Sequence, residues 1–338
     1  MNDGNWHFYC EDPEVASVAR HWRPDEDPEK FASGFGHNIL ELFARFRDRG
    51  YDVTLGPDVP GGTSLVVAFI SDFVNLRTAL VLSGFPCLMI RSDSALHFDA
   101  PFRPDRVIVP NRSAYWIQRY GADAEYLPAL PQRGLIPRDQ TRTVFEAITL
   151  KCNPEHVPKV LLEPDMVAGI VASGFSLHID SPSTTNGSDQ TWHDFSNADL
   201  TLCIRGSMVD NADVRKPPTK LINAWNARTV PIISGEASYL ELASPGEDSL
   251  LINDARELPA TLARLRAEPE AFERIRLGAA RRADEYSLVK LVDEWAALCG
   301  RVERQRIGSL ERWQRVLRIL TVKISNRLQR RRSASTSK

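Results

Sequence analysis

Short apolar runs alternate along this chain with longer segments in which apolar residues recur at helical spacing. Several of the short runs lack polar alternation, as expected for strands of a parallel sheet that helices cover on both faces. The first half therefore predicts strands at residues 6–10, 51–55, 64–70, 86–90, 106–109 and 124–128. The second half predicts strands at residues 144–150, 175–179, 199–204, 230–233 and 249–252.

Most of the segments between these strands have apolar residues at helical spacing. The clearest helix covers residues 38–49, with Asn38 placed to cap its start and Gly50 to end it. Its apolar face consists of Ile39, Leu42, Phe43 and Phe46. Further helices are expected at residues 112–120, 164–172, 219–227, 258–267, 271–285 and 288–298.

A proline-rich segment, residues 128–143, separates the two series of strands and helices. The length of 338 residues also favours two domains. Strands that alternate with helices predict α/β domains with parallel sheets. We expect two doubly wound, Rossmann-like domains at residues 1–140 and 141–300, followed by a basic amphipathic tail at residues 301–338.

The composition is that of an ordinary globular protein, with 43% hydrophobic and 25% charged residues. The five cysteines lie far apart and show no zinc-ligand spacing, so we expect neither a disulfide framework nor a metal site. The first residues are acidic and do not resemble a signal peptide, and the uncharged stretch at residues 78–90 is too short to span a bilayer. These features predict a cytoplasmic protein.

Charge is distributed unevenly. Residues 301–338 carry twelve basic and two acidic side chains, whereas the first 300 residues carry 42 acidic and 30 basic ones. Within residues 310–332, apolar side chains recur at helical spacing beside many arginines, which is typical of a helix on an anionic membrane surface. Packing of this helix on the acidic body is the alternative. Nucleic-acid binding is not expected, because no known module is present.

Two glycines, Gly34 and Gly36, precede the helix that contains Asn38. Glycines at a helix start let a ligand approach the backbone N–H groups, so this loop is a candidate binding site. A dinucleotide fingerprint would need a third glycine where Ile39 stands, which weakens the alternative of a nicotinamide-dependent oxidoreductase. A helix start that binds nothing is the other alternative. Motifs of P-loop proteins, α/β-hydrolases and zincins are absent from the sequence.

The segment at residues 215–242 carries the most chemical information. A basic turn leads into a helix, a buried strand and a polar loop, and Lys216 and Lys220 stand near the helix N-terminus. Two lysines are unfavourable there unless an anion binds. Glu236 and Tyr239 follow the strand and should lie on the rim of the ligand crevice, unless they only cap a helix and fill the core.

This segment resembles the C-terminal domain of GT-B-type glycosyltransferases, in the group of retaining family-four-like enzymes. The resemblance rests on KPPTKLINA at residues 216–224 and VPII at residues 230–233. It extends to AARRADEYS at residues 279–287, followed by Leu291 and Trp295, which is similar to the final helices of that family. Residues 106–128 resemble the last βαβ unit of the family's first domain. The resemblance implies two domains that face a cleft.

The same resemblance implies a function: transfer of a sugar from a nucleotide-sugar donor to a saccharide or lipid-linked acceptor, as in bacterial surface-polysaccharide assembly, without a cofactor. The implied donor-binding residues are Arg205, Lys216, Lys220, Asn223, Glu236 and Tyr239. The acceptor is expected at Gly34, Gly36 and Asn38, and an inverting reaction would need a base, for which His37 and Asp93 are candidates.

One departure from the family is clear. The two glutamates of its Glu-x7-Glu motif fall on Arg215 and Asn223 in this sequence. Asn223 can still form hydrogen bonds with a ribose, and Arg215 can pair with a phosphate. The loss of both carboxylates keeps open the alternative of a non-catalytic, sugar-binding or scaffold protein with the same fold.

Overall fold

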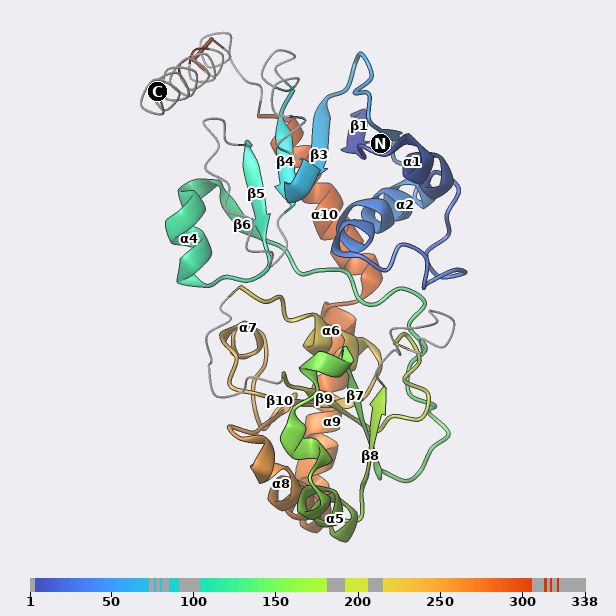
Figure 1. The fold of residues 1–338 in the computed structure, drawn as a ribbon, viewed down its shortest axis with the longest axis vertical. Coiled ribbons are helices and arrows are strands. Elements are labelled where there is room, and N and C mark those ends of the chain that lie inside the picture. The colour runs from blue at the N-terminus through green and yellow to red at the C-terminus, as the bar shows by residue number, and fades with distance from the viewer. Residues whose placement is uncertain are drawn as a thin grey trace, which may run out of the picture.

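The computed structural model describes residues 4–72, 76, 80, 85–90, 104–180, 192–205, 215–305, 313, 314, 317 and 321. They form two parallel sheets, each covered by helices, which lie one beyond the other along the molecule (Figure 1). The first sheet has six strands in the order β2-β1-β3-β4-β5-β6. Its strands are β1 (Trp6–Tyr9), β2 (Val53–Gly56), β3 (Leu65–Phe69), β4 (Cys87–Ile90), β5 (Arg106–Val109) and β6 (Ala124–Tyr126).

The second sheet has five parallel strands in the order β11-β10-β9-β7-β8. These strands are β7 (Ala147–Lys151), β8 (Ser176–Asp180), β9 (Leu200–Cys203), β10 (Val230–Ile233) and β11 (Leu250–Leu251). Every strand expected from the sequence is present, within a few residues at each end. The α/β class and the two doubly wound, Rossmann-like halves are confirmed.

Both sheets have the same topology. The chain begins in an inner strand, moves outward on one side, and then continues on the other side, so the strand order reverses once in each sheet. The reversal lies between β1 and β3 in the first sheet and between β7 and β9 in the second. In doubly wound sheets, ligands bind at this reversal, beyond the carboxyl ends of the strands. The topology therefore marks one candidate binding region in each domain.

Helices of the first domain include one that the sequence pattern did not predict, α1 (Pro13–Ala19), which Asp12 caps. A π-helical turn, η1 (Gly36–Leu40), continues directly into α2 (Glu41–Asp48). The short helices α4 (Ala114–Tyr120) and η2 (Gly121–Asp123) precede β6.

The expected cap at Asn38 is wrong, because helical backbone already begins at Gly34 and the Ser33 hydroxyl accepts the Gly36 N–H at 3.0 Å. The expected end is confirmed. Gly50 adopts φ 77° and its N–H donates to the Arg47 carbonyl, while the Tyr51 N–H donates to Phe46. This pair of bonds satisfies the last carbonyls of α2.

Helices of the second domain cover both faces of its sheet. They are η3 (Pro154–His156), η4 (Lys159–Leu162), α5 (Pro164–Ala172), α6 (Thr219–Asn226), α7 (Ala237–Leu240), η5 (Ala255–Glu257), α8 (Leu258–Ala267) and α9 (Pro269–Glu285). The last helix of the second half, α10 (Leu288–Glu303), follows α9. Apart from the short α7 and the 3-10 turns, these helices match the sequence pattern. Within the described residues, no helix is both long enough and apolar enough to cross a membrane.

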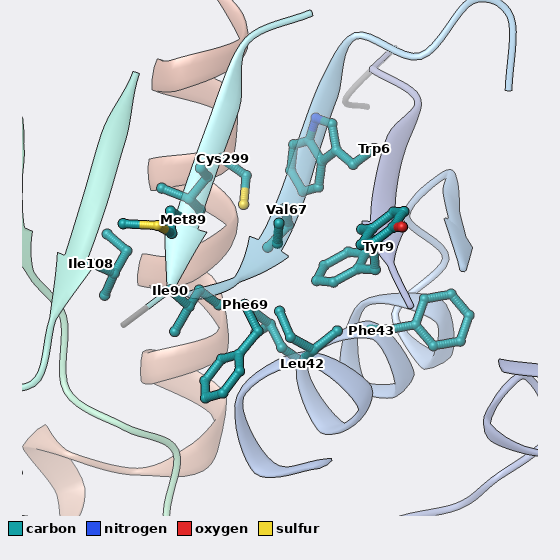
Figure 2. Packing of buried hydrophobic residues seen from close by; sticks show 14 of the residues in the cluster. Trp6, Tyr9, Leu42, Phe43, Val67, Phe69, Met89, Ile90, Ile108 and Cys299 are labelled. Carbon is teal, nitrogen blue, oxygen red and sulfur yellow. The ribbon is translucent and has the colours of Figure 1, made fainter. Parts of the chain in front are cut away.

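The last helix, α10, leaves the second domain and packs in the core of the first. Figure 2 shows Cys299 of α10 facing strand residues such as Met89, with Leu42 and Phe43 of α2 in the same cluster. The indole Nε1 of Trp295 donates to the Pro128 carbonyl at 3.1 Å, which fixes α10 to the segment that joins the domains. The first core therefore depends on residues from both ends of the chain.

The carboxyl ends of the two sheets face each other. Asn111, directly after β5, donates from Nδ2 to the Lys216 carbonyl at 2.8 Å, just before α6. The neighbouring Arg112 N–H donates to Glu241 Oε2 at 2.9 Å. The arrows of β3 and β8 point toward the boundary between the domains (Figure 1). Both candidate binding regions therefore open toward this boundary.

Candidate active site

A cavity of about 1030 Å³ lies at the strand reversal of the second sheet. Its walls come from the residues that follow β7 and β9, from the loop after β11 and from the first turns of α6. Four of the six residues expected to bind the donor line this cavity: Arg205, Lys216, Lys220 and Asn223. Residues far apart in the sequence are brought together because parallel strands end at the same edge of the sheet.

Lys220 lines the cavity from the first turn of α6. Its ammonium donates to the Ile204 carbonyl at 2.9 Å. Burial lowers the pKa of Lys220, and the neighbouring positive charge of Arg205 acts in the same direction. Burial also raises the pKa of Cys203 to about 12 and that of Cys152 above its usual range, so these neighbouring thiols supply no negative charge. An anionic ligand would stabilise the ammonium form of Lys220.

Arg205 follows β9, and two residues of the segment after β10 contact its guanidinium group. Its Nε lies 3.5 Å from Glu236 Oε2, and its Nη2 donates to the Tyr239 hydroxyl at 3.4 Å. Tyr239 is fully buried and Glu236 is largely buried, so neither lies on the rim of the crevice, where the sequence pattern placed them. Their position indicates that they orient Arg205 and do not themselves face the cavity.

Asn223 lies one turn further along α6, and its side-chain oxygen is already engaged. Its Oδ1 accepts the backbone N–H of Gln132 at 2.8 Å, which brings the interdomain segment to the wall of the cavity. The Nδ2 group of Asn223 is the part of this side chain that remains to donate to a ligand. Sequence reasoning missed Gln132, since nothing in a proline-rich linker marks a residue that contacts a distant helix.

The cavity also contains residues that directly follow β7, among them Cys152 and Asn153. Lys151 is the last residue of β7 and also lines the cavity. In the structure it pairs with Asp180 at 2.7 Å and lies 4.8 Å from the Phe195 ring centre. Other charged residues that line the cavity are paired as well, since Arg256 lies within 4 Å of both Glu163 and Asp254.

In the first domain, the glycines expected to form an acceptor loop lie in the first turn of a helix. A Cβ atom on Gly36 would come within 1.9 Å of the Phe31 carbonyl oxygen, so only glycine fits there. Gly34 faces the Phe69 ring with ordinary clearance, and its carbonyl accepts from Asn38 Nδ2 at 2.7 Å. Because Phe69 ends β3, this turn lies at the strand reversal of the first sheet.

His37, in the same turn, contacts a carboxylate that the sequence analysis did not single out. Its Nδ1 lies 3.0 Å from Glu41 Oε2, and the Glu41 side chain is completely buried. The spacing of four residues on one helix was a signal for this pair. Asp93, the other candidate base, lies outside the described residues.

The glycine pair does not have the surroundings of a dinucleotide fingerprint, in which the glycine-rich turn directly joins the first strand to a helix. Here α1 stands between β1 and the turn. Among the residues that the structure describes, no cluster of three or more histidine, cysteine, aspartate or glutamate side chains is placed to hold a metal ion.

No family model matches the sequence. No curated protein matches it either. Solved structures do match along most of the chain. Sucrose-phosphate synthase from Thermosynechococcus elongatus has a TM-score of 0.57 at 11% identity, over 87% of this chain and 98% of that one.

Two further structures give a similar result. Anabaena HepE in complex with UDP and glucose has a TM-score of 0.55 at 11% identity, over 87% of this chain and 99% of that one. AviGT4, a glycosyltransferase involved in avilamycin A biosynthesis, has a TM-score of 0.51 at 14% identity, over 89% of this chain and 98% of that one. At such identities the likeness shows the fold, which is the two-domain GT-B fold.

Proposed function

We propose that this chain is a glycosyltransferase that moves a sugar from a nucleotide-sugar donor to a hydroxyl group of a saccharide or lipid-linked acceptor. The observation that carries the proposal is the cavity at the strand reversal of the second sheet, with Arg205, Lys216 and Lys220 around the start of α6. The HepE structures hold UDP, UDP with glucose, or UDP-glucose, and share this fold.

The chemistry follows from the charges. As the bond between sugar and phosphate breaks, negative charge grows on the departing nucleoside diphosphate. Lys216, Lys220 and Arg205 offer positive groups to it, and the N-terminus of α6 adds free N–H donors. We expect these groups to neutralise the leaving diphosphate without a metal ion or another cofactor. Glu236 and Tyr239 contribute by holding Arg205 in place.

The acceptor would approach from the first domain, at the turn that contains Gly34, Gly36 and Asn38. This turn lies at the carboxyl end of β3, and the carboxyl ends of both sheets face the domain boundary. His37 lies in this turn, and we expect it to take the proton of the acceptor hydroxyl. Asp93 remains the second candidate base from the sequence.

Binding of nucleotides to the full chain tests the proposal. Thermal unfolding would be followed with UDP, GDP, ADP, CMP, TDP, NAD and NADP. A ligand at 100 times its Kd stabilises a protein by about 2.7 kcal/mol, which raises the Tm of a domain of this size by roughly 5–11 °C. We expect one nucleoside diphosphate to stabilise the wild type, and the effect to be lost in Lys220→Met. The exposed Lys290 of α10 provides the matched control Lys290→Met, which should keep the full shift.

Two results would count against the proposal. Stabilisation by NAD or NADP alone would indicate an oxidoreductase instead. Stabilisation by a nucleoside diphosphate, with no release of that nucleotide from its sugar derivative under any acceptor tested, would indicate the non-catalytic, sugar-binding protein.

We further propose that the basic tail at residues 310–332 binds an anionic membrane surface, as suits assembly of a surface polysaccharide at the cytoplasmic face. Of the few tail residues that the structure describes, Trp313 is 67% exposed and Leu317 is 58% exposed. Apolar side chains four residues apart on a helix share one face. Exposure of both favours a membrane contact over packing on the acidic body.

Sedimentation with lipid vesicles tests this contact. The full chain should sediment with vesicles that contain phosphatidylglycerol and stay in solution with pure phosphatidylcholine. The double variant Trp313→Glu and Leu317→Glu should lose most of the binding. Equal sedimentation of wild type and variant would contradict the proposal.

A further inference from the structure

A nucleoside diphosphate has two parts, and proteins bind them in different ways. The diphosphate is anionic, and the cavity in the second domain offers it the positive groups of Arg205, Lys216 and Lys220. The base is flat, and proteins bind bases by stacking aromatic side chains on them. An aromatic surface in the wall of the same cavity is therefore the expected place of the base.

Among the residues that the structure describes, two with large aromatic side chains line this cavity, Trp192 and Phe195. Phe195 is buried, and the Lys151 ammonium lies 4.8 Å from the centre of its ring. One face of this ring is thus already covered by a cation. Trp192 is partly exposed, so it is the aromatic side chain of the two that a base can reach.

The indole N–H group of Trp192 also differs from those of tryptophans that only fill the core. The Nε1 atoms of Trp22, Trp225 and Trp295 donate to backbone carbonyls at 2.9, 3.2 and 3.1 Å. Nε1 of Trp192 is buried and makes no hydrogen bond to any residue that the structure describes. Buried polar atoms of folded proteins nearly always have a partner. A turn of this ring onto a ligand breaks no hydrogen bond, and it lets the N–H group donate to a ligand oxygen.

Trp192 lies beside the strand reversal that the cationic groups surround. Phe195, in the same segment before β9, contacts Lys151 at the end of β7. Lys220 donates to the carbonyl of Ile204, directly after β9. Because β7 and β9 are neighbours in the sheet, the aromatic segment and the cationic groups lie next to each other. One nucleotide can therefore contact both.

The segment that carries Trp192 is fixed by residues outside the second sheet. The N–H group of Ile136, in the interdomain segment, donates to the His193 carbonyl at 2.8 Å, and the Phe195 N–H donates to the Ile136 carbonyl at 2.8 Å. The side chain of His193 contacts the first domain, since its Nδ1 lies 2.8 Å from Glu29 Oε1. The residue next to Trp192 is thus held from two sides.

The loop that carries Glu29 is itself attached to the interdomain segment. The Gly134 N–H donates to Asp25 Oδ1 at 2.9 Å. Consecutive Cα atoms are about 3.8 Å apart, so a shift of His193 would be passed directly to Trp192. The contact between Glu29 and His193 therefore couples the first domain to the wall of a cavity in the second.

We propose that the base of the nucleotide donor stacks on Trp192, and that Glu29 is a positioning residue that holds Trp192 in the cavity wall through His193. This inference rests on the proposed glycosyltransferase function. It extends the nucleotide site from the second domain to the first, so residues of both domains determine the affinity for the donor.

Calorimetric titration of the full chain tests the role of Trp192. The first probe is whichever of UDP, GDP, ADP and TDP stabilises the wild type, and the second is pyrophosphate, which has no base. Loss of a stacked aromatic side chain weakens binding by about 5- to 150-fold, so Trp192→Ala should raise the Kd of the nucleoside diphosphate within this range. Trp192→Phe keeps an aromatic ring and should lose much less.

Pyrophosphate serves as the internal control for folding. Its Kd should be the same for the wild type, Trp192→Ala and Trp192→Phe, because the diphosphate contacts other residues. Two results would overturn the proposal: an unchanged Kd of the nucleoside diphosphate in Trp192→Ala, or an equal loss of affinity for pyrophosphate.

Tryptophan fluorescence provides a readout that does not depend on affinity. Saturation with the nucleoside diphosphate should quench the fluorescence of the wild type, whereas pyrophosphate should not. Trp192→Phe should bind the nucleotide and lose most of this quenching. Equal quenching in the wild type and in Trp192→Phe would show that the base contacts another residue.

The role of Glu29 is tested by Glu29→Ala. One hydrogen bond contributes a factor of about 2 to 10, so the Kd of the nucleoside diphosphate should rise by this factor while that of pyrophosphate stays constant. The matched control is Glu26→Ala in the same loop, since Glu26 pairs with Arg23 on the surface and is 69% exposed. The control should bind both probes like the wild type.

A double variant distinguishes positioning from a general structural effect. Because Glu29 acts through Trp192, Glu29→Ala combined with Trp192→Ala should bind the nucleoside diphosphate as Trp192→Ala alone does. Independent losses that multiply in the double variant would overturn the role of Glu29. Wild-type affinity in Glu29→Ala would overturn it as well.

The same variants separate this inference from its alternatives. If Trp192→Ala weakens binding of the sugar nucleotide but not of the nucleoside diphosphate, the ring contacts the sugar and the proposal is wrong. If no nucleoside diphosphate stabilises the wild type, the proposed function fails and this inference fails with it. If one binds equally to the wild type and Trp192→Ala but not to Lys220→Met, the proposed function stands and only the role of Trp192 is wrong.

Discussion

The indole Nε1 of Trp6 donates a hydrogen bond to Glu303 Oε2 at 3.0 Å, although 297 residues separate the two in sequence. Trp6 begins the first strand, and Glu303 ends the last helix. The contact attaches α10 to the first domain, although α10 follows the whole second domain in the sequence. The two domains are therefore coupled through α10 as well as through the segment that follows β6.

Replacement of Trp295 tests how much the first domain depends on α10. Trp295 is buried in its core and bonded to the Pro128 carbonyl. Loss of a buried tryptophan costs about 3–5 kcal/mol, so Trp295→Ala should lower the free energy of unfolding by that amount. Val289 lies on the same helix with 61% exposure, and Val289→Ala should change it by less than about 0.5 kcal/mol. Urea unfolding measures both, and equal effects would contradict the placement of α10.

The two glycines of the helical turn should differ in their tolerance of alanine. Gly36→Ala places a methyl group against the Phe31 carbonyl, and overpacking of this kind costs about 1–3 kcal/mol. Gly34→Ala meets only the edge of Phe69 at 3.7 Å and should be nearly neutral. Thermal unfolding of the two variants gives the comparison. If Gly34→Ala proved the more destabilising, the π-helical turn would be wrongly placed.

Acid should destabilise the protein partly through His7. This side chain is buried, with Nδ1 near the Thr54 hydroxyl and Nε2 near the Gly56 carbonyl. Burial lowers the pKa of His7 to about 4, so between roughly pH 6.5 and 4 the unfolded chain binds a proton that the folded chain does not. Stability therefore falls as the pH is lowered through this window.

The loss through His7 should reach about 3 kcal/mol at the acid end, since each pKa unit corresponds to about 1.4 kcal/mol. Unfolding of the wild type and His7→Gln would be compared at pH 7 and pH 4.5. The variant should lose less stability between these values, because glutamine binds no proton. Parallel pH curves for the two proteins would refute the assignment.

Affinity for the nucleoside diphosphate that binds should fall in alkaline solution. Burial lowers the pKa of Lys220, and only its ammonium form attracts the diphosphate. Binding thus favours the protonated lysine, and affinity decreases as the pH rises through the lowered pKa, which lies below the ordinary value of about 10.4. Calorimetric titration from pH 7 to pH 10 measures the decrease. Arginine stays charged over this pH range, so the affinity of Lys220→Arg should not decrease between pH 7 and pH 10. A wild-type affinity that does not change with pH would disprove the role of Lys220.

The part of the candidate site that lies next to strand ends and helix starts could be predicted from the sequence. Arg205 follows β9, and Lys216 and Lys220 precede or begin a helix, so the topology of a parallel sheet was enough to bring them together. Glu236 and Tyr239 were expected to reach the same crevice but lie behind Arg205. A periodic pattern says which residues follow a strand, whereas the direction of a side chain depends on what packs around it.

The sequence by itself determined the strands, most helices and the α/β class, because burial on both faces of a parallel sheet leaves a continuous apolar run and a surface helix leaves a periodic one. The sequence did not predict the short helices α1 and α7, because each has too few residues to show a helical period. Only the tertiary structure decided the contacts of Glu41 with Arg133, of Gln132 with Asn223, and of Trp6 with Glu303. Each of these contacts is a hydrogen bond or ion pair between segments that are far apart in the sequence. Which residues pair depends on their distance in the folded structure, and the local sequence pattern does not contain that distance.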